Sequence, residues 1–395
     1  MKRTTVLISG AGVAGITLAY WLRRNGFTPT VVERARSVRD GGHKIDIRGA
    51  ALPVVERMGL LDQIRERATG VRVASFVDHE GRRLASMDGD AFGGRGHDDA
   101  EILRGDLLRL LFEATEGVEY LWGEEIADLH QTADHVEVTF ARGVRRRFDL
   151  VIGADGVHSV TREKVFGPGH VRDLGHRVAV AAVPNHLDLD REEVTYASPG
   201  RTVIVYSTAH DTGAKAMFLL ADDQPVPADA HRYLADRFAD AGWEVPTLLA
   251  NAGDDVYLDA VCQVHLDRWS SHRVALVGDA AYCASVASGQ GTSLALVGAY
   301  VLAGELAAAR DHAAGFAAYE AELREFVAIN QKMGPANIKR MVLRGRAGVW
   351  LSMKMLSLLW KLPIRDKMIE KVTGPIDRAA NAITLKHYPV RCFAA

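Results

Sequence analysis

Residues 4–34, TTVLISGAGVAGITLAYWLRRNGFTPTVVER, decide the fold of this 395-residue chain. They predict a strand over residues 4–9, a glycine turn over 10–15 and a helix over 16–25. A second strand follows over 28–32 and ends at the acid Glu33. Gly26 is the expected helix stop. This order is typical of the first βαβ unit of a dinucleotide-binding domain.

The three glycines of the turn have different expected roles. Gly10 allows the tight turn, Gly12 lets a pyrophosphate approach the backbone, and Gly15 lets the helix pack closely on the sheet. The helix start offers unpaired N–H groups and a partial charge of about +0.5 to phosphates. Glu33 follows Gly15 by 18 residues, near the spacing of an acid that binds an unphosphorylated ribose, as in FAD or NAD.

A glycine-rich turn in an ordinary α/β unit is the structural alternative for this stretch. The register of strand, helix and acid favours cofactor binding instead. The expected contacts come from the turn, the helix start and the strand end: Gly10, Gly12, Val13, Ala14, Gly15, Glu33 and Arg34.

Two later segments repeat the arrangement of an apolar strand followed by a glycine-containing turn. Residues 150–162, LVIGADGVHSVTR, place Asp155 and Gly156 at the end of a strand, where ligands of open α/β sheets bind. Residues 273–310 predict a strand, a Gly-Asp turn, a glycine loop and a long helix, with the candidates Gly278, Asp279, Gly289, Gly291 and Thr292. Carboxylate oxygens of the aspartate suit sugar-like hydroxyls. The alternative in both segments is an acid that only fixes a turn or caps a helix.

Composition excludes several classes of function. A hydrophobic content of 48% and a charged content of 25% are ordinary for a globular chain, and the net charge of −2 gives no footprint for nucleic acid. Three cysteines without a CxxC pattern indicate a reducing compartment. We expect no signal peptide, no metal site and no membrane span, since residues 347–362 are too short and too charged to cross a bilayer. The expected location is the cytoplasm.

The fold class predicted is α/β, with a Rossmann-like domain, an inserted antiparallel-sheet domain and a C-terminal helix. The first domain is expected over 1–72, 98–172 and 268–335, the sheet domain over 73–97 and 173–267, and the helix and tail over 336–395. Within these limits we expect loops over 34–47 and 88–99, turns over 190–196 and 210–213, and a small antiparallel set over 118–121, 136–140 and 145–148. An amphipathic helix over 338–372 is expected to dock on its own chain, a partner subunit or a membrane surface, the first being favoured.

The three segments, in this order, resemble the group A flavin-dependent monooxygenases, which include p-hydroxybenzoate hydroxylase, tetracycline-inactivating flavoenzymes and actinobacterial polyketide hydroxylases. The short C-terminal helix looks most like the tetracycline-inactivating branch. The resemblance implies that the glycine turn and Glu33 hold the ADP part of FAD, that Asp155 and Gly156 serve FAD and NAD(P)H, and that Asp279 binds the ribityl chain. By the same resemblance, Arg104 contacts FAD.

The resemblance also implies an activity. NADPH or NADH reduces FAD, O2 forms a C4a-hydroperoxyflavin, and an aromatic or polyketide-like molecule is hydroxylated, in antibiotic biosynthesis or inactivation. A monomer or homodimer is expected. Two alternatives stay open: a flavoprotein that catalyses a non-redox cyclisation or another tailoring step, and a plain NAD-dependent dehydrogenase.

One loop departs from the family pattern. Tyr282 replaces a histidine, and Ser285 and Val286 stand where two prolines are usual. Proline fixes φ near −65°, so this change frees the loop backbone and puts the substrate class in doubt. No side chain is a certain catalyst. The candidates for the substrate pocket are His43, Arg48, Tyr206, Met217, Phe218, Tyr282 and Val286.

Overall fold

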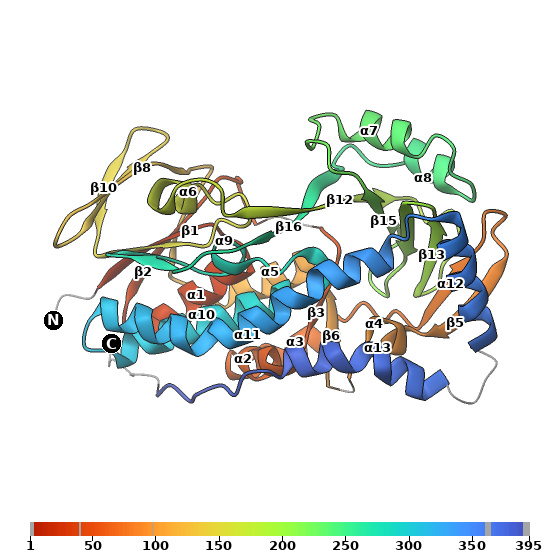
Figure 1. Cartoon of the computed structure of the whole chain (residues 1–395). Helices are drawn as coiled ribbons and strands as arrows, with labels where there is room; N and C mark the ends of the chain where they lie inside the picture. The colour runs from red at the N-terminus through yellow and green to blue at the C-terminus, as the bar shows by residue number, and fades with distance from the viewer. Residues whose placement is uncertain (1–3, 39–40, 97, 360–364, 390–395) are drawn as a thin grey trace.

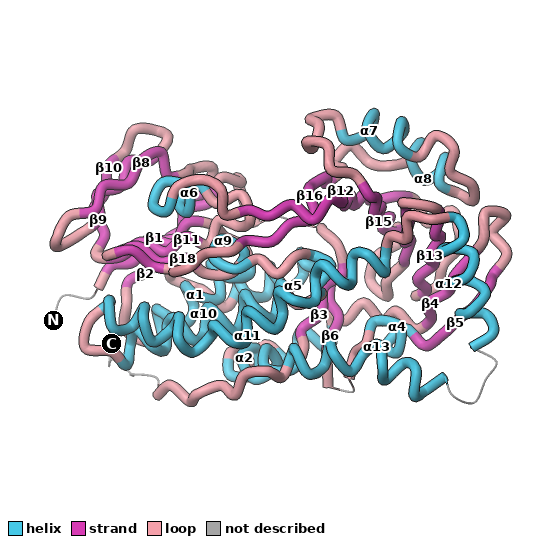
Figure 2. Tube along the Cα trace, viewed as in Figure 1, coloured by secondary structure: helices cyan, strands magenta, loops and turns pink. Residues whose placement is uncertain are grey.

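The computed structural model describes residues 4–38, 41–96, 98–359 and 365–389. Two large sheets lie at opposite ends of an elongated molecule, and long helices run between them (Figure 1). Both termini lie at the end that holds the six-stranded sheet (Figure 1). Figure 2 shows the same separation, with most strands gathered at the two ends, and helices and a few strands between.

The first sheet has the order β17-β18-β11-β1-β2-β7, and every neighbouring pair except β17–β18 is parallel. Its strands are β17 (Ser270–Ser271), β18 (Val274–Leu276), β11 (Leu150–Gly153), β1 (Thr5–Ser9), β2 (Thr28–Glu33) and β7 (Glu119–Trp122). The sequence prediction was wrong for β7, which was expected in the small antiparallel set. It pairs parallel with β2, Thr30 opposite Glu119, because a four-residue strand carries no pattern that specifies its partner.

Helices cover one face of this sheet and a small sheet covers the other. Helices α1 (Val13–Arg24), α5 (Arg104–Glu113) and α10 (Gly291–Ala308) share the main hydrophobic core with one face of β1 and β11. On the opposite face, Leu7, Val32 and Val151 pack on the antiparallel strands β8 (Ile126–Gln131), β9 (Val136–Phe140) and β10 (Arg145–Phe148). Helix α6 (Val160–Phe166) follows β11.

The second sheet has seven strands in the order β16-β12-β15-β14-β13-β4-β5. They are β16 (Tyr257–Val264), β12 (Val171–Val183), β15 (Ala214–Ala221), β14 (Arg201–Tyr206), β13 (Glu192–Ser198), β4 (Val73–Val77) and β5 (Arg83–Asp88). Strand β13 replaces part of the turn expected over 190–196. Its charged start obscured an apolar alternation in which Val194 and Tyr196 enter the core under α7 (Ala230–Arg237) and α8 (Val245–Ala250).

A two-stranded ribbon lies between the two large sheets. It is formed by β3 (Lys44–Ile47) and β6 (Ala100–Leu103), and β3 corrects the loop expected over 34–47. The loop expected over 88–99 contains α4 (Gly89–Gly93), which the side chain of Asp88 caps. Three short elements follow β3 in the chain: η1 (Gly49–Ala51), α2 (Leu52–Arg57) and α3 (Leu61–Glu66).

The C-terminal part is divided differently from the prediction. The helix expected over 338–372 is split into the end of α11 (His312–Met341), α12 (Arg346–Leu359) and α13 (Arg365–Ala380), and residues 360–364 of that range lie outside the described residues. Among the described residues, α10 has the length and apolarity of a membrane-crossing helix, but 78% of it is buried inside the fold. It is the central core helix. The domain boundaries stay a prediction, which the membership of the two large sheets supports.

Candidate active site

The three predicted segments meet at one edge of the six-stranded sheet. Strands β18, β11, β1 and β2 are adjacent and parallel, so the turns that follow them lie side by side. The Ala154 amide donates to the carbonyl of Ser9 at 2.8 Å, and the Val277 amide donates to that of Gly153 at 2.9 Å. The Gly278 turn also packs on α1, since a Cβ on Gly278 would lie 2.8 Å from Cβ of Ala14.

The glycines of the first turn are required for two different reasons. A Cβ on Gly10, at φ +106°, would lie 2.5 Å from the carbonyl oxygen of Ala154, and one on Gly15 would lie 1.9 Å from that of Gly10. A Cβ on Gly12 would meet nothing within 4 Å. The fold itself therefore explains Gly10 and Gly15, whereas the open space beside Gly12 fits a bound group.

Glu33 is held against this turn. Its Oε2 accepts a hydrogen bond from the Ala11 amide at 2.9 Å, and its Oε1 accepts one from the Ala35 amide at 2.8 Å. The carboxylate thus lies at the mouth of the glycine turn, where a ribose would follow a pyrophosphate. Arg34, the next residue, is exposed.

Helices α1 and α10 start at this edge without side-chain caps. Neither α1, after Gly12, nor α10, after Gln290, has a capping side chain or an acid in its first turn. By contrast, Ser159 caps α6 and Asp311 caps α11. The first-turn amides of α1 and α10 are therefore free of side-chain acceptors and suited to an anionic or electron-rich ligand. Cβ atoms on Gly289 and Gly291 would meet nothing within 4 Å, and Thr292 is half-buried.

Asp279 lies in a recess of the protein. Its side chain is exposed to solvent, yet desolvation by the surrounding protein raises its pKa, while a hydrogen bond from Cys283 and the charge of Arg104 oppose that rise. Arg104 begins α5, and its amide donates to the carbonyl of His43 at 3.1 Å. Burial and the charge of Arg104 lower the pKa of His43 to about 4. Arg104 therefore lies electrostatically close to both His43 and Asp279.

The carboxylate of Asp155 is engaged by its own loop. Its oxygens accept hydrogen bonds from the Ser159 hydroxyl and from the amide and hydroxyl of Thr161, the latter two at 2.9 Å. These contacts favour the structural alternative, in which Asp155 fixes the start of α6. Gly156 has a φ of +80°, and a Cβ there would meet nothing within 4 Å. The buried Arg162 joins this loop to the next by donating to the carbonyls of Val157 (2.7 Å) and Ala280 (3.2 Å).

Two pocket candidates lie against the glycine loop. Tyr206 and Met217, on the inner face of the seven-stranded sheet, share a hydrophobic cluster with Ala287 of η2 (Val286–Ser288) and Ile338 of α11. Val286 starts η2 and is 41% exposed. His43, at the entrance to β3, lies beside Arg104 as described above. Tyr206 and Met217 thus lie where the second sheet meets the loop that holds Val286, and His43 lies beside Arg104.

Three other candidates face elsewhere. Phe218 follows Met217 in β15 and so points to the opposite face, where it packs edge-to-face on Phe238. Tyr282 belongs to α9 (Asp279–Tyr282) and is buried against α10 and α11, where its hydroxyl accepts from Tyr319 at 3.2 Å. Arg48 is buried and donates to the carbonyls of Gly93 and Gly94, at 2.6 and 2.7 Å, so it fixes the end of α4.

Sequence reasoning missed a buried ionic network beside Tyr206. The Lys44 ammonium lies 2.6 Å from Glu193 and 2.9 Å from Glu101, and the Lys44 amide donates to the Tyr206 hydroxyl at 2.9 Å. Arg95 adds a second cation, 2.5 Å from Glu101. The network fixes the β3–β6 ribbon to the seven-stranded sheet. No spacing in the sequence indicated it, because its members come from four separate segments.

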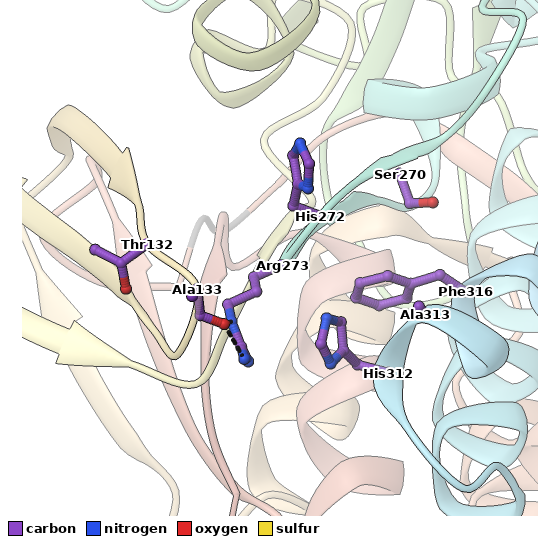
Figure 3. A pocket seen from close by; sticks show the side chains of 8 residues that line it. All are labelled: Thr132, Ala133, Ser270, His272, Arg273, His312, Ala313 and Phe316. Carbon is purple, nitrogen blue, oxygen red and sulfur yellow. Dashed lines mark hydrogen bonds between the residues drawn. The ribbon is translucent and has the colours of Figure 1, made fainter.

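A separate pocket lies at the other edge of the six-stranded sheet (Figure 3). Arg273, which precedes β18, lines it, and its Nε donates to the carbonyl of Ala133 at 2.8 Å. His312 lines the same pocket, and burial together with Arg273 lowers the pKa of His312. This edge carries the amino ends of the parallel strands, so the pocket is distinct from the site described above.

The comparisons with known proteins agree with this geometry. Residues 3–331 match the family described as FAD binding domain. A flavin-dependent monooxygenase from Legionella longbeachae is 37% identical over 98% of this chain and 99% of the relative. The chain therefore belongs to the FAD-dependent monooxygenases of the FAD binding domain family. This membership sets aside the plain NAD-dependent dehydrogenase.

Two further relatives extend the match. The uncharacterised protein Rv1260 from Mycobacterium tuberculosis is 46% identical over 85% of this chain and 93% of its own length. The crystal structure of tetracycline destructase Tet(51) is 34% identical, covers 98% of this chain and 100% of that chain, and superposes with a TM-score of 0.85. The predicted resemblance and fold class are thus confirmed. FAD is the cofactor of the family, with NADPH or NADH as electron donor.

Proposed function

We propose that this protein hydroxylates an electron-rich aromatic or polyketide-like small molecule with O2, using electrons from NADPH or NADH. When bound, FAD supplies the redox chemistry: it accepts two electrons from the nicotinamide and activates O2, whose second oxygen atom leaves as water. The observation that carries the proposal is the convergence of the three segments on one sheet edge, where Gly12 leaves open space. We further propose a cytoplasmic monomer or homodimer with the domain division given above.

Different residues at this edge would bind different parts of FAD. The first turn and the start of α1 would bind the pyrophosphate, and Glu33 the adenosine ribose. Asp279 would accept hydrogen bonds from the ribityl hydroxyls. The start of α10, near Gly291, would place its positive end toward the electron-rich end of the ring system. Arg104 would offset negative charge near Asp279.

The substrate would lie between the flavin edge and the inner face of the second sheet. The half-buried Met217 and the exposed Val286 offer apolar surface for a planar ring system, and the buried Tyr206 packs beside Met217 in the same hydrophobic cluster. His43 is neutral at pH 7 because its pKa is about 4, so it can accept a hydrogen bond without bringing a charge. The similarity to the tetracycline destructase Tet(51) supports a tetracycline-like molecule as the substrate.

One observation keeps a second candidate open. Ser285 has a φ of +84° and is buried, in the loop where relatives usually carry prolines. Proline cannot adopt this conformation, so the loop beside Val286 follows its own path. A flavoprotein that catalyses a non-redox cyclisation is therefore the alternative.

A substrate screen with labelled oxygen distinguishes hydroxylation from non-redox cyclisation. Purified holoenzyme is mixed with NADPH or NADH, 18O2 and a panel of phenols and fused-ring polyketides, and product mass is followed with nicotinamide oxidation. The proposal expects a gain of one labelled oxygen atom and one nicotinamide oxidised per product. A product isomeric with its substrate, formed without nicotinamide oxidation, contradicts hydroxylation and favours cyclisation.

A further inference from the structure

A stretch near the C-terminus combines strong positive charge with exposed apolar side chains. Between Glu325 and Asp366 the sequence holds eight lysines and arginines and no acidic residue, although the net charge of the chain is −2. Helix α12 lies within this stretch, at the end of the molecule away from the termini (Figure 1). Basic amphipathic helices are typical of membrane surfaces.

The described part of α12 is covered on one side only. Val349 is 9% exposed and Ser352 and Met353 are half-buried, on the side where α12 contacts β5 and β13. Three large apolar side chains point away from the sheet: Trp350, Leu351 and Met355 are 58%, 53% and 48% exposed. Leu351 and Met355 are four residues apart on one face, and Trp350 lies about 100° round the helix from Leu351, so the three form a broad exposed stripe.

Cations border this stripe. The Lys354 ammonium lies 4.1 Å from the centre of the Trp350 ring, and Arg344 and Arg346 are exposed near the helix start. Arg346 lies electrostatically close to Asp240, which already pairs with Arg201 at 2.5 Å. Lysine and arginine bury their stems beside apolar groups while their charges stay at the polar surface, which suits the headgroup layer of a bilayer.

We propose that the α12 face, defined as Arg346, Trp350, Leu351, Lys354 and Met355, binds the surface of an anionic phospholipid bilayer. Helix α12 has 14 residues and is about 21 Å long, less than the ~30 Å hydrocarbon core, so it lies on the surface and does not span. This contact is independent of the proposed reaction.

Other occupants fit the α12 face less well. A two-fold contact with a second copy places the same patch on itself, so the cations of the stretch repel one another. A nucleic acid matches the cations but leaves Trp350, Leu351 and Met355 against phosphates. A bilayer interface suits both the apolar and the basic side chains of the α12 face. Tryptophan favours the headgroup region, and anionic headgroups attract lysine and arginine.

The test is co-sedimentation of the full-length holoenzyme with vesicles. Vesicles of phosphatidylcholine alone are compared with vesicles in which phosphatidylglycerol makes up part of the lipid. We expect sedimentation with the anionic vesicles only, and less of it as salt is added. The triple variant W350S/L351S/M355S should lose binding, and K354Q should weaken it about fivefold.

A matched control lies at the other end of the molecule. Val144, in the β9–β10 turn, is 55% exposed, and Arg145, the first residue of β10, is exposed too, so V144S/R145Q removes an apolar and a basic side chain elsewhere. This variant should bind vesicles as the wild type does. Thermal unfolding and flavin content should be unchanged in every variant, because the altered side chains are exposed.

Four results would overturn the proposal. These are wild-type protein that stays in solution with anionic vesicles, a triple variant that still sediments, and duplex DNA binding of equal strength that needs the same residues. The fourth is a dimer, seen by light scattering, that the triple variant dissociates, since the α12 face would then join two copies.

Discussion

The amide of Ala11 donates a 2.9 Å hydrogen bond to Oε2 of Glu33, which ties the acid at the end of β2 to the turn after β1. The contact pre-arranges the first half of the cofactor site within the protein. It also explains why the acid must lie at the end of the second strand: only there does the parallel pairing of β1 and β2 bring it beside the turn.

The first prediction compares two glycines of that turn. Gly15→Val should destabilise the apoprotein by about 3 kcal/mol or more, because its Cβ would overlap the Gly10 carbonyl. Gly12→Val should change the free energy of unfolding by less than about 1 kcal/mol, because its Cβ faces open space. Urea unfolding of the flavin-free proteins measures both. Equal losses of stability would contradict the distinction.

The second prediction concerns the loop at Ser285. Ser285→Pro should cost about 3 kcal/mol or more, since proline cannot reach a φ of +84°. Ser285→Gly should be nearly neutral or slightly stabilising, because glycine adopts positive φ without strain, although it removes the 3.3 Å hydrogen bond from the Ala287 amide to the serine hydroxyl. Ser285→Ala loses that bond and keeps the strain, so it should be less stable than Ser285→Gly in thermal unfolding.

The third prediction concerns the buried ionic network. Lys44→Met should destabilise by about 3 to 5 kcal/mol, because the buried Glu193 would lose the cation that pairs with it, whereas Glu101 would keep Arg95. Adding Glu193→Gln should recover part of this loss. Arg147→Met is the control: its partner Glu137 is exposed, so the cost should be about 0 to 1 kcal/mol. A double-mutant cycle in urea that shows no coupling between positions 44 and 193 would count against the network.

The fourth prediction is a pH dependence. His43 has a pKa lowered to about 4 in the folded chain, so between about pH 6.5 and pH 4 the unfolded chain binds a proton that the folded chain does not. The stability contributed by neutral His43 is present above pH 6.5 and is lost as pH falls through that window, by up to about 3 kcal/mol. His43→Gln should flatten the acid side of the stability profile of the apoprotein.

The local order of residues was sufficient to predict which turns lie at the edge of the six-stranded sheet where we place FAD. Each of the three segments joins a strand to a turn within a few residues, so the strand's carboxyl end fixes where the turn lies. Glu33 and Asp279 could therefore be located before the structure. The role of Asp155 could not be predicted. Its carboxylate oxygens accept hydrogen bonds from Ser159 and Thr161, and the sequence does not specify the loop conformation that brings them together.

The residues that face the proposed substrate site could not be predicted from the sequence, because their orientation depends on long-range packing. Met217 and Phe218 were both candidates, but consecutive strand residues face opposite ways, and only the sheet's neighbours show which one faces the flavin edge. Strand β13 was hidden by its charged start at Glu192 and Glu193, whose partners Arg83 and Lys44 lie far away in sequence. Tyr282 follows Asp279 by three residues, yet α9 turns it into the core.

The most direct test is a titration of flavin-free protein with FAD, following flavin fluorescence or heat. The wild type should bind one FAD per chain. Gly12→Val in the first turn should weaken binding at least about tenfold by filling the space of the pyrophosphate, and Asp279→Ala in the third turn should weaken it about 10- to 100-fold by removing a charged acceptor. Val144→Ser, on a distant turn, should bind as the wild type does. Protein that binds no FAD, or variants in both turns that bind as tightly as the wild type, would contradict the assignment of these turns to one flavin.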